Sequence, residues 1–202
     1  MSLVNFTTRE ITCKIVYYGP GRSGKTTNLQ YIYSQVPADR RGRMVSLATQ
    51  TDRTLFFDFL PLDLGSISGF TTKFQLYTVP GQVYYNATRK LVLRGADGVV
   101  FVVDSQRERY DDNIDSLRNL HENLLEENID VTDFPLVMQY NKRDLPGVIS
   151  FDELDDTLNF RGAPAFPAAA VAGQGVFTTL KSASQLVLQN LSRRFGQPVP
   201  AQ

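Results

Sequence analysis

Residues 13–27 read Cys-Lys-Ile-Val-Tyr-Tyr-Gly-Pro-Gly-Arg-Ser-Gly-Lys-Thr-Thr. The apolar run before Gly19 predicts a buried strand, and the segment after Gly24 predicts a helix. The loop between them fits G-x-x-x-x-G-K-[ST], the phosphate-binding P-loop. Glycines let such a loop turn tightly and point backbone N–H groups at phosphate oxygens, and the helix presents its positive end to the same anion. An ordinary glycine-rich turn is the alternative interpretation.

Side chains of this loop also have predicted roles. Lys25 is expected to reach the β- and γ-phosphates, and the Thr26 hydroxyl group is expected to bind Mg²⁺. Arg22 adds a positive charge that either contacts the phosphates or faces solvent. The predicted nucleotide-binding residues of the loop are Gly19, Gly21, Arg22, Ser23, Gly24, Lys25, Thr26 and Thr27.

The composition narrows the class of protein. A chain of 202 residues predicts one domain, over residues 1–196, with a mobile tail over 197–202. The 21 basic and 21 acidic residues balance, so no broad field favours nucleic acid or an anionic membrane. The sequence shows neither an N-terminal signal segment nor a long apolar span, which predicts a cytoplasmic protein without a direct membrane anchor. Cys13, the one cysteine, is expected in the core.

Strand-like and helix-like segments alternate along the chain. Strands are expected over residues 11–18, 54–62, 71–79, 98–104, 136–140 and 165–171, with a short leading strand within 2–10. Helices are expected over residues 27–36, 86–93, 112–127, 151–158 and 176–191. Residues 37–53 are expected to form a functional loop, and 63–69 a hairpin turn. This alternation predicts an α/β fold, a mostly parallel sheet with helices on both faces.

Polar residues follow several of the expected strands. Gln82, Asp104 and Asn141 come after apolar strands, as the P-loop does. Ligands of such sheets bind at the carboxyl ends of the strands, so these residues are expected to converge on one site.

The segment Asn-Lys-Arg-Asp over residues 141–144 fits the pattern N-K-x-D. A carboxylate such as that of Asp144 accepts two N–H bonds from the edge of guanine, and adenine does not offer this pair of donors. A polar loop with a helix cap is the alternative. The position directly after an apolar strand, in a chain with a P-loop, favours guanine binding.

With these motifs the chain resembles the Ras-like small GTPases over residues 11–192, and among them the bacterial GTPases of gliding motility and cell polarity. The stretches that carry the resemblance are the P-loop, residues 53–62, Thr-Val-Pro-Gly-Gln at 78–82 and Asn-Lys-Arg-Asp-Leu-Pro at 141–146. The resemblance implies the Ras-like G-domain variant of the P-loop NTPase fold. It implies a switch that binds GTP or GDP with Mg²⁺ and hydrolyses GTP.

The same resemblance implies partners. A roadblock-type GTPase-activating protein is expected at the switch loops, residues 37–62 and 78–95. Polarity or motility effectors are expected as well, and the protein is expected to reach a cell pole through its partners.

The resemblance also assigns roles to matching residues. Thr54 is implied to bind Mg²⁺ and sense the γ-phosphate, Gly81 to contact that phosphate, and Gln82 to orient the attacking water. Arg53 is implied to supply an arginine finger in cis, although a solvated loop arginine is the alternative. With Gln82 and Arg53, Lys25 completes the expected catalytic set. Further nucleotide contacts are expected from Asn141, Lys142, Asp144 and, through backbone groups, Val171 and Ala172.

The chain departs from the family pattern at Thr78, where most Ras-like proteins have an aspartate that supports Mg²⁺. Asp58 is the expected replacement, because it lies four residues after Thr54 and so on the same face of a strand. The expected metal set is therefore Thr26, Thr54 and Asp58. A solvent-facing strand residue is the alternative for Asp58. His121 is expected at the surface or as a cap, without a catalytic role.

Two other functions stay open at this point. An ATPase or nucleoside kinase would use the same P-loop, although N-K-x-D and the lack of a lid-like arginine segment argue against it. A module that holds nucleotide without hydrolysing it is the other, because Thr78 stands at a position that usually supports the metal.

Overall fold

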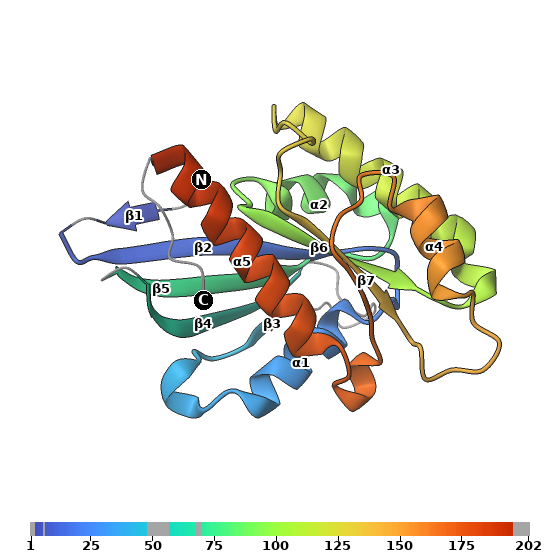
Figure 1. Ribbon diagram of the computed structural model, residues 1–202, viewed down its shortest axis with the longest axis horizontal. Helices are drawn as coiled ribbons and strands as arrows, with labels where there is room; N and C mark the ends of the chain where they lie inside the picture. Colours follow the sequence, from blue (N-terminus) through green and yellow to red (C-terminus); the bar gives the residue numbers. More distant parts are fainter. Residues whose placement is uncertain (1–2, 6, 48–56, 68–69, 196–202) are drawn as a thin grey trace.

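The structure is a computed structural model that describes residues 3–5, 7–47, 57–67 and 70–195 (Figure 1). In these ranges eight strands form one sheet in the order β3-β4-β5-β2-β6-β7-β8, and β1 pairs with β2 outside this path. The strands are β1 (Leu3–Asn5), β2 (Glu10–Tyr18), β3 (Val45–Leu47), β4 (Phe57–Ile67), β5 (Phe70–Thr78), β6 (Gly98–Asp104), β7 (Leu136–Asn141) and β8 (Ala165–Pro167).

Helices cover both faces of this sheet, as Figure 1 shows with α5 crossing in front of it. The helices are α1 (Lys25–Gln35), α2 (Asn86–Leu93), α3 (Tyr110–Glu126), α4 (Phe151–Leu158) and α5 (Val176–Phe195). The 3₁₀ turns are η1 (Ala38–Arg40), η2 (Val83–Tyr85), η3 (Arg107–Arg109) and η4 (Ala170–Ala172). Because β2, β5, β6, β7 and β8 pair in parallel, the predicted α/β fold with a mostly parallel sheet is confirmed.

The alternation of side chains along β2 divides the core into two layers. Cys13, Ile15 and Tyr17 pack on the side of α1 and α5, while Val16 and Tyr18 pack on the side of α2, α3 and α4. Both faces of the strand are buried, which explains its nearly continuous apolar sequence. Burial raises the pKa of the Cys13 thiol to about 12, so this thiol stays protonated as a core residue.

The hairpin of β4 and β5 is longer than predicted. A turn was expected over residues 63–69, but β4 continues to Ile67, so that prediction is wrong over its first five residues. The pairing shifts register between Asp63 and Ser66. Turn-favouring residue types here are therefore accommodated by an irregularity inside the hairpin.

Two other predictions need correction. The stretch expected to be one irregular loop, 37–53, contains η1 and β3, and β3 pairs antiparallel with β4. The strand expected over 165–171 ends at Pro167. It ends there because Ala168 N–H donates the last bond to the Tyr140 carbonyl, and Ala170 N–H then turns to the Asn141 side chain.

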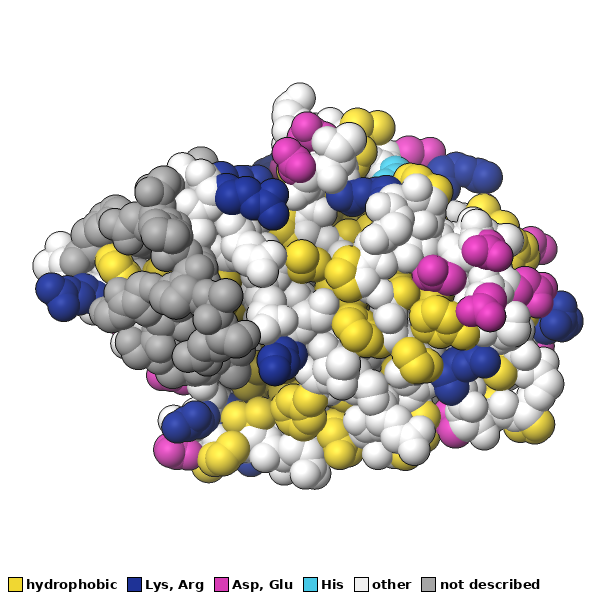
Figure 2. Space-filling view, viewed as in Figure 1, with side chains coloured by type: hydrophobic (Ala, Val, Ile, Leu, Met, Phe, Trp, Pro, Cys, Tyr) yellow, Lys and Arg dark blue, Asp and Glu magenta, His cyan; other side chains and the backbone are white. Residues whose placement is uncertain are grey.

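The surface in Figure 2 carries charges of both signs, and acidic side chains gather over α4. Of the helices in the described ranges, none combines the length and the apolar character needed to cross a bilayer.

Candidate functional site

The site is built where β2, β6 and β7 end. The P-loop follows β2, and close contacts explain its glycines. A Cβ atom on Gly24, whose φ is 102°, would lie 2.2 Å from Nδ2 of Asn141. A Cβ atom on Gly81 would lie 2.2 Å from the Cα atom of Gly21, because the segment after β5 presses against the P-loop. Glycine is therefore required at both contacts, which bring three predicted segments together.

Lys25 is buried at the start of α1, and its Nζ atom donates to the carbonyl groups of Gly19 at 2.9 Å and Pro20 at 2.6 Å. Burial and, to a smaller extent, the Arg89 guanidinium lower the pKa of Lys25 to about 7, while Asp58 opposes the shift. The ammonium group is thus held in the loop by the dipoles of two carbonyl groups.

Asp58 on β4 is fully buried, so the interpretation as a solvent-facing residue is wrong. Its Oδ2 atom accepts hydrogen bonds from the hydroxyl groups of Thr26 at 2.6 Å and Thr78 at 2.9 Å. Ser46 of β3 donates to the other carboxylate oxygen. The backbone N–H of Asp58 donates to Thr78 Oγ1 at 2.8 Å, which shows that the two residues face each other across β4 and β5.

This geometry fits a divalent cation beside Thr26. The Thr26 hydroxyl donates its hydrogen bond to Asp58, which leaves the lone pairs of the Thr26 oxygen available for a cation. Mg²⁺ in such sites is bound by few protein oxygens together with phosphate oxygens and water. Within the described part of the chain, no cluster of three or more His, Cys, Asp or Glu residues offers a metal cage of protein ligands alone.

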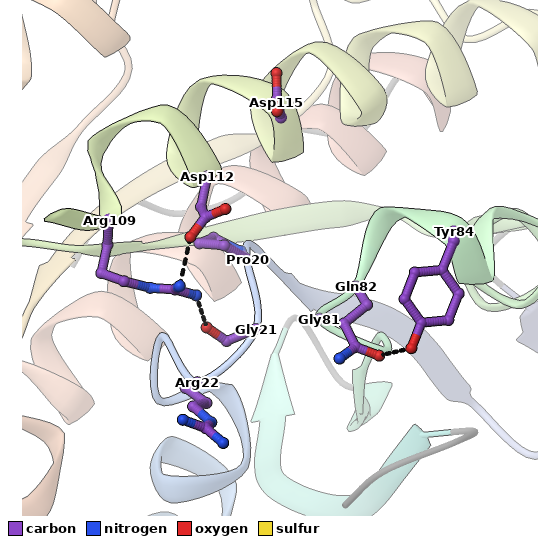
Figure 3. A pocket seen from close by; sticks show the side chains of 9 residues that line it. All are labelled: Pro20, Gly21, Arg22, Gly81, Gln82, Tyr84, Arg109, Asp112 and Asp115. Atoms are coloured by element: carbon purple, nitrogen blue, oxygen red, sulfur yellow. Dashed lines mark hydrogen bonds and ion pairs between the residues drawn. The ribbon is translucent and has the colours of Figure 1, made fainter. Parts of the chain in front are cut away.

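The segment after β5 carries Gly81 and Gln82 (Figure 3). Gln82 is exposed, and its Oε1 atom accepts a hydrogen bond from the Tyr84 hydroxyl. Figure 3 shows this side chain directed toward Tyr84 rather than toward Gly21. The same pocket is lined by the P-loop, by Arg109 at the end of η3 and by the start of α3, and Arg109 donates to the Gly21 carbonyl at 2.8 Å.

Asn141 joins the two sequence motifs. Its Nδ2 atom donates to the Ser23 carbonyl at 2.7 Å, and its Oδ1 atom accepts from Ala170 N–H at 2.9 Å. One side chain therefore ties the P-loop to η4, the turn that contains Val171 and Ala172. Both of these residues are exposed, as a backbone contact with a ligand requires.

Lys142 has a left-handed backbone with φ of 65°, and its Nζ atom contacts Asp104 Oδ2 at 2.5 Å and Gln106 Oε1 at 2.9 Å. Asp104 is fully buried at the end of β6. Asp144 is exposed in the turn that follows. The turn is fixed because Arg143 N–H donates to the Ala168 carbonyl at 2.9 Å.

The remaining residues singled out from the sequence differ in how far they are exposed. Arg22 is exposed with φ of 63°, Ser23 is buried, and Thr27 is half-buried in the first turn of α1. His121 is half-buried on α3, with its ring 4.9 Å from that of Phe160, and burial lowers its pKa. The predicted finger and γ-phosphate sensor, Arg53 and Thr54, lie outside the described residues.

Sequence reasoning missed two arginines that touch the P-loop, Arg89 and Arg109. Arg89 is fully buried and its Nη2 atom lies 3.3 Å from the Gly19 carbonyl oxygen. Its spacing of three and four residues from Val92 and Leu93 puts it on the buried stripe of α2. A charged residue on an apolar stripe was the signal that could have identified it.

The sequence of this chain is similar to those of known proteins. Residues 2–187 match the model of the ADP-ribosylation factor family. The chain is also 58% identical over 193 residues to the mutual gliding-motility protein MglA of Myxococcus xanthus (strain DK1622), an alignment that covers 96% of this chain and 99% of that protein.

Proposed function

The chain belongs to the Arf and Ras-like family of small GTPases, and on this premise we propose that it is a GTP-dependent switch for gliding motility and cell polarity. The extent of the similarity to a gliding-motility protein supports this biological role. The proposal places the protein in the cytoplasm, from which partners recruit it to a cell pole.

The observation that best supports nucleotide binding is the pair of hydrogen bonds that the Asn141 side chain makes with Ser23 and Ala170. This pair of bonds joins the P-loop to the turn that is proposed to contact the base, which supports one nucleotide site formed by both. Asp144 and Lys142, with the backbone of Val171 and Ala172, then contact guanine and its sugar. The P-loop residues 19–27 contact the phosphates.

A competition experiment tests this assignment. A fluorescent GDP analogue bound to the protein should be displaced by GDP and GTP at far lower concentration than by ATP. Equal displacement by ATP would favour an ATPase or nucleoside kinase.

Thr26, Thr54 and Asp58 are the residues proposed to hold Mg²⁺, Thr26 and Thr54 as direct ligands and Asp58 directly or through water. The hydrogen bond between Thr26 and Asp58 supports their part in this set. The bound ion would neutralise charge on the β- and γ-phosphates. Asp58 would orient the Thr26 oxygen toward the ion, while Thr78 holds Asp58 in place.

Hydrolysis is proposed to use Gln82 to orient water, Gly81 N–H and Lys25 to bind the γ-phosphate, and Arg53 to neutralise developing charge. Single-turnover hydrolysis of GTP separates this proposal from a module that only holds nucleotide. Gln82→Leu should bind GTP as the native chain does but hydrolyse it about 10²-fold or more slowly, since an oriented water is lost.

The proposed activator is a roadblock-type protein of the MglB kind that contacts the switch segments 37–62 and 78–95. Such a protein, added in excess, should raise the single-turnover rate of the native chain. No stimulation and no binding would remove this partner from the proposal.

A further inference from the structure

Arg89 is among the largest fully buried side chains in the described ranges, and three elements surround its guanidinium group. Nη1 donates to Asn119 Oδ1 at 2.7 Å, and Nη2 donates to Ser116 Oγ at 2.7 Å, both on α3. Nη2 also donates to the Gly19 carbonyl of the P-loop at 3.3 Å. The guanidinium carbon lies 4.3 Å from the centre of the Tyr18 ring.

Amide, hydroxyl and carbonyl oxygens and the Tyr18 ring surround this cation. Among the described residues, no carboxylate lies within ion-pair distance of Arg89, and its Nε atom lacks a hydrogen-bond partner. Burial lowers the pKa of Arg89. A buried charge without a counter-ion is costly, and an apolar side chain of similar size is often at least as good for stability. Stability is therefore a weak explanation for an arginine here.

A second residue of α2 joins the same network. Asn86 Oδ1 accepts hydrogen bonds from Asn119 at 2.9 Å and Asn123 at 2.8 Å. The Tyr18 hydroxyl donates to Asn119 Oδ1 at 2.8 Å and accepts from Asn123 at 2.9 Å. The first turn of α2 is thus fixed to α3 and to the end of β2 by side chains that belong to none of the nucleotide motifs.

The network meets the candidate site at one atom. The Gly19 carbonyl oxygen accepts from Arg89 on α2 and also from Lys25 Nζ at 2.9 Å. Only η2 separates α2 from Gln82. A shift of α2 would therefore move Gln82 and change the partners of the carbonyl that holds Lys25.

We propose that Arg89 is a positioning residue that ties α2 to the P-loop, and that it sets the position of Gln82 for hydrolysis of GTP. The inference rests on the proposed function. Arg89 touches neither water nor phosphate in this role. It acts through the Gly19 carbonyl and through the attachment of α2 to α3.

The central experiment uses Arg89→Met, which keeps length and removes the fork of donors. Single-turnover GTP hydrolysis, GTP and GDP affinities and the unfolding temperature are measured for each variant. We expect a rate about 10- to 100-fold below native, because a catalytic group displaced by about 1 Å loses this much. GDP affinity should stay within about threefold of native, since the contacts proposed for GDP are retained.

Two further variants test whether the loss of rate comes from the guanidinium group of Arg89. Arg89→Lys should recover part of the rate, because an ammonium group can reach Gly19 but cannot bind Asn119 and Ser116 as a fork. Arg118→Met is the matched control, since Arg118 is exposed on α3 and pairs with Asp115 at 3.5 Å. It should hydrolyse GTP as the native chain does.

A native rate in folded Arg89→Met overturns the inference, as does a loss of GDP and GTP affinity equal to the loss of rate. If Arg89→Met fails to fold, Ser116→Ala and Asn119→Ala each remove one acceptor, and native rates in both overturn it. A native chain that does not hydrolyse GTP would instead contradict the proposed function. The inference would then be decided by the ratio of GTP to GDP affinity, which Arg89→Met should lower.

Discussion

At the level of single residues, Asp58 and Thr78 support the proposal that one carboxylate takes the place of another. Asp58 reaches Thr26 from β4, while the position on β5 holds Thr78, whose hydroxyl donates to Asp58. We expect Asp58→Asn to raise the Mg²⁺ concentration needed to retain nucleotide by about 10- to 100-fold, the usual cost of losing a group that orients a ligand. Nucleotide release during titration with a chelator measures this.

Two controls accompany that variant. Asp152→Asn, on the exposed first turn of α4, should leave Mg²⁺ dependence at the native level. The exchange of Asp58→Thr with Thr78→Asp returns a carboxylate from the opposite strand and should recover part of the affinity. Unchanged Mg²⁺ dependence in Asp58→Asn would mean that water and phosphate alone complete the coordination shell.

We expect the proposed contact of Lys25 with phosphate to make nucleotide binding depend on pH. Its pKa is lowered to about 7, and a phosphate group beside it raises that pKa. The bound state then holds the proton more tightly, so affinity is full below about pH 7 and falls by up to about tenfold per pH unit above it. GDP titrations between about pH 6 and pH 9, a range around the lowered pKa of Lys25, check this prediction.

The guanidinium group of Lys25→Arg stays charged over this whole range. That variant should bind more weakly but with a flatter pH profile. A flat profile for the native chain would show that Lys25 is protonated throughout.

At the scale of elements, η2 holds the side chain of Gln82, the residue proposed to orient water, through one hydrogen bond. Tyr84 is exposed, and its hydroxyl donates to Gln82. We expect Tyr84→Phe to speed single-turnover hydrolysis by up to about fivefold, because one net hydrogen bond is worth about 1 kcal/mol and its loss frees Gln82. Leu91→Ala, an exposed substitution on α2, is the control. A slower Tyr84→Phe would mean that Tyr84 positions Gln82 productively.

The elements themselves were largely predictable, because their signals are local. The elements over residues 86–93, 98–104 and 151–158 have the boundaries that were predicted from the sequence. The end of β8 was not predictable in this way, since it depends on Asn141 drawing Ala170 N–H out of the ladder. The length of β4 likewise depends on pairing with β5, which overrides the turn preference of residues around Gly65.

In the candidate site, too, some residues could be predicted from local sequence and others depend on contacts between distant segments. The motif residues were found because phosphate and guanine chemistry demands particular types at particular spacings. A metal role for Asp58 was predicted from its place on the strand, but its burial and its contact with Thr78 depend on the pairing of two strands. Arg89 and Arg109 contact backbone carbonyls of a distant loop. The apolar stripe of α2 marks Arg89 as a buried residue, but it does not indicate which carbonyl the side chain contacts.

The arrangement of the whole molecule limits how a partner can act. Helices cover both faces of the sheet, so the candidate site is reached where the strands end. A protein bound to the switch segments would therefore meet the P-loop from that edge. It can accelerate hydrolysis either by inserting its own cation or by placing one from this chain.

Our last prediction separates these two routes. The resemblance to the bacterial GTPases of gliding motility implies that Arg53, beside Thr54, is a finger in cis. The native chain should turn over GTP slowly alone and faster with a roadblock-type activator. An arginine finger is worth about 10³ to 10⁵ in rate, so Arg53→Ala should lose most of the stimulation while still binding the activator. Arg22→Ala, on the P-loop, serves as the comparison for loss of a nearby charge. If Arg53→Ala is stimulated as strongly as the native chain, the cation comes from the activator.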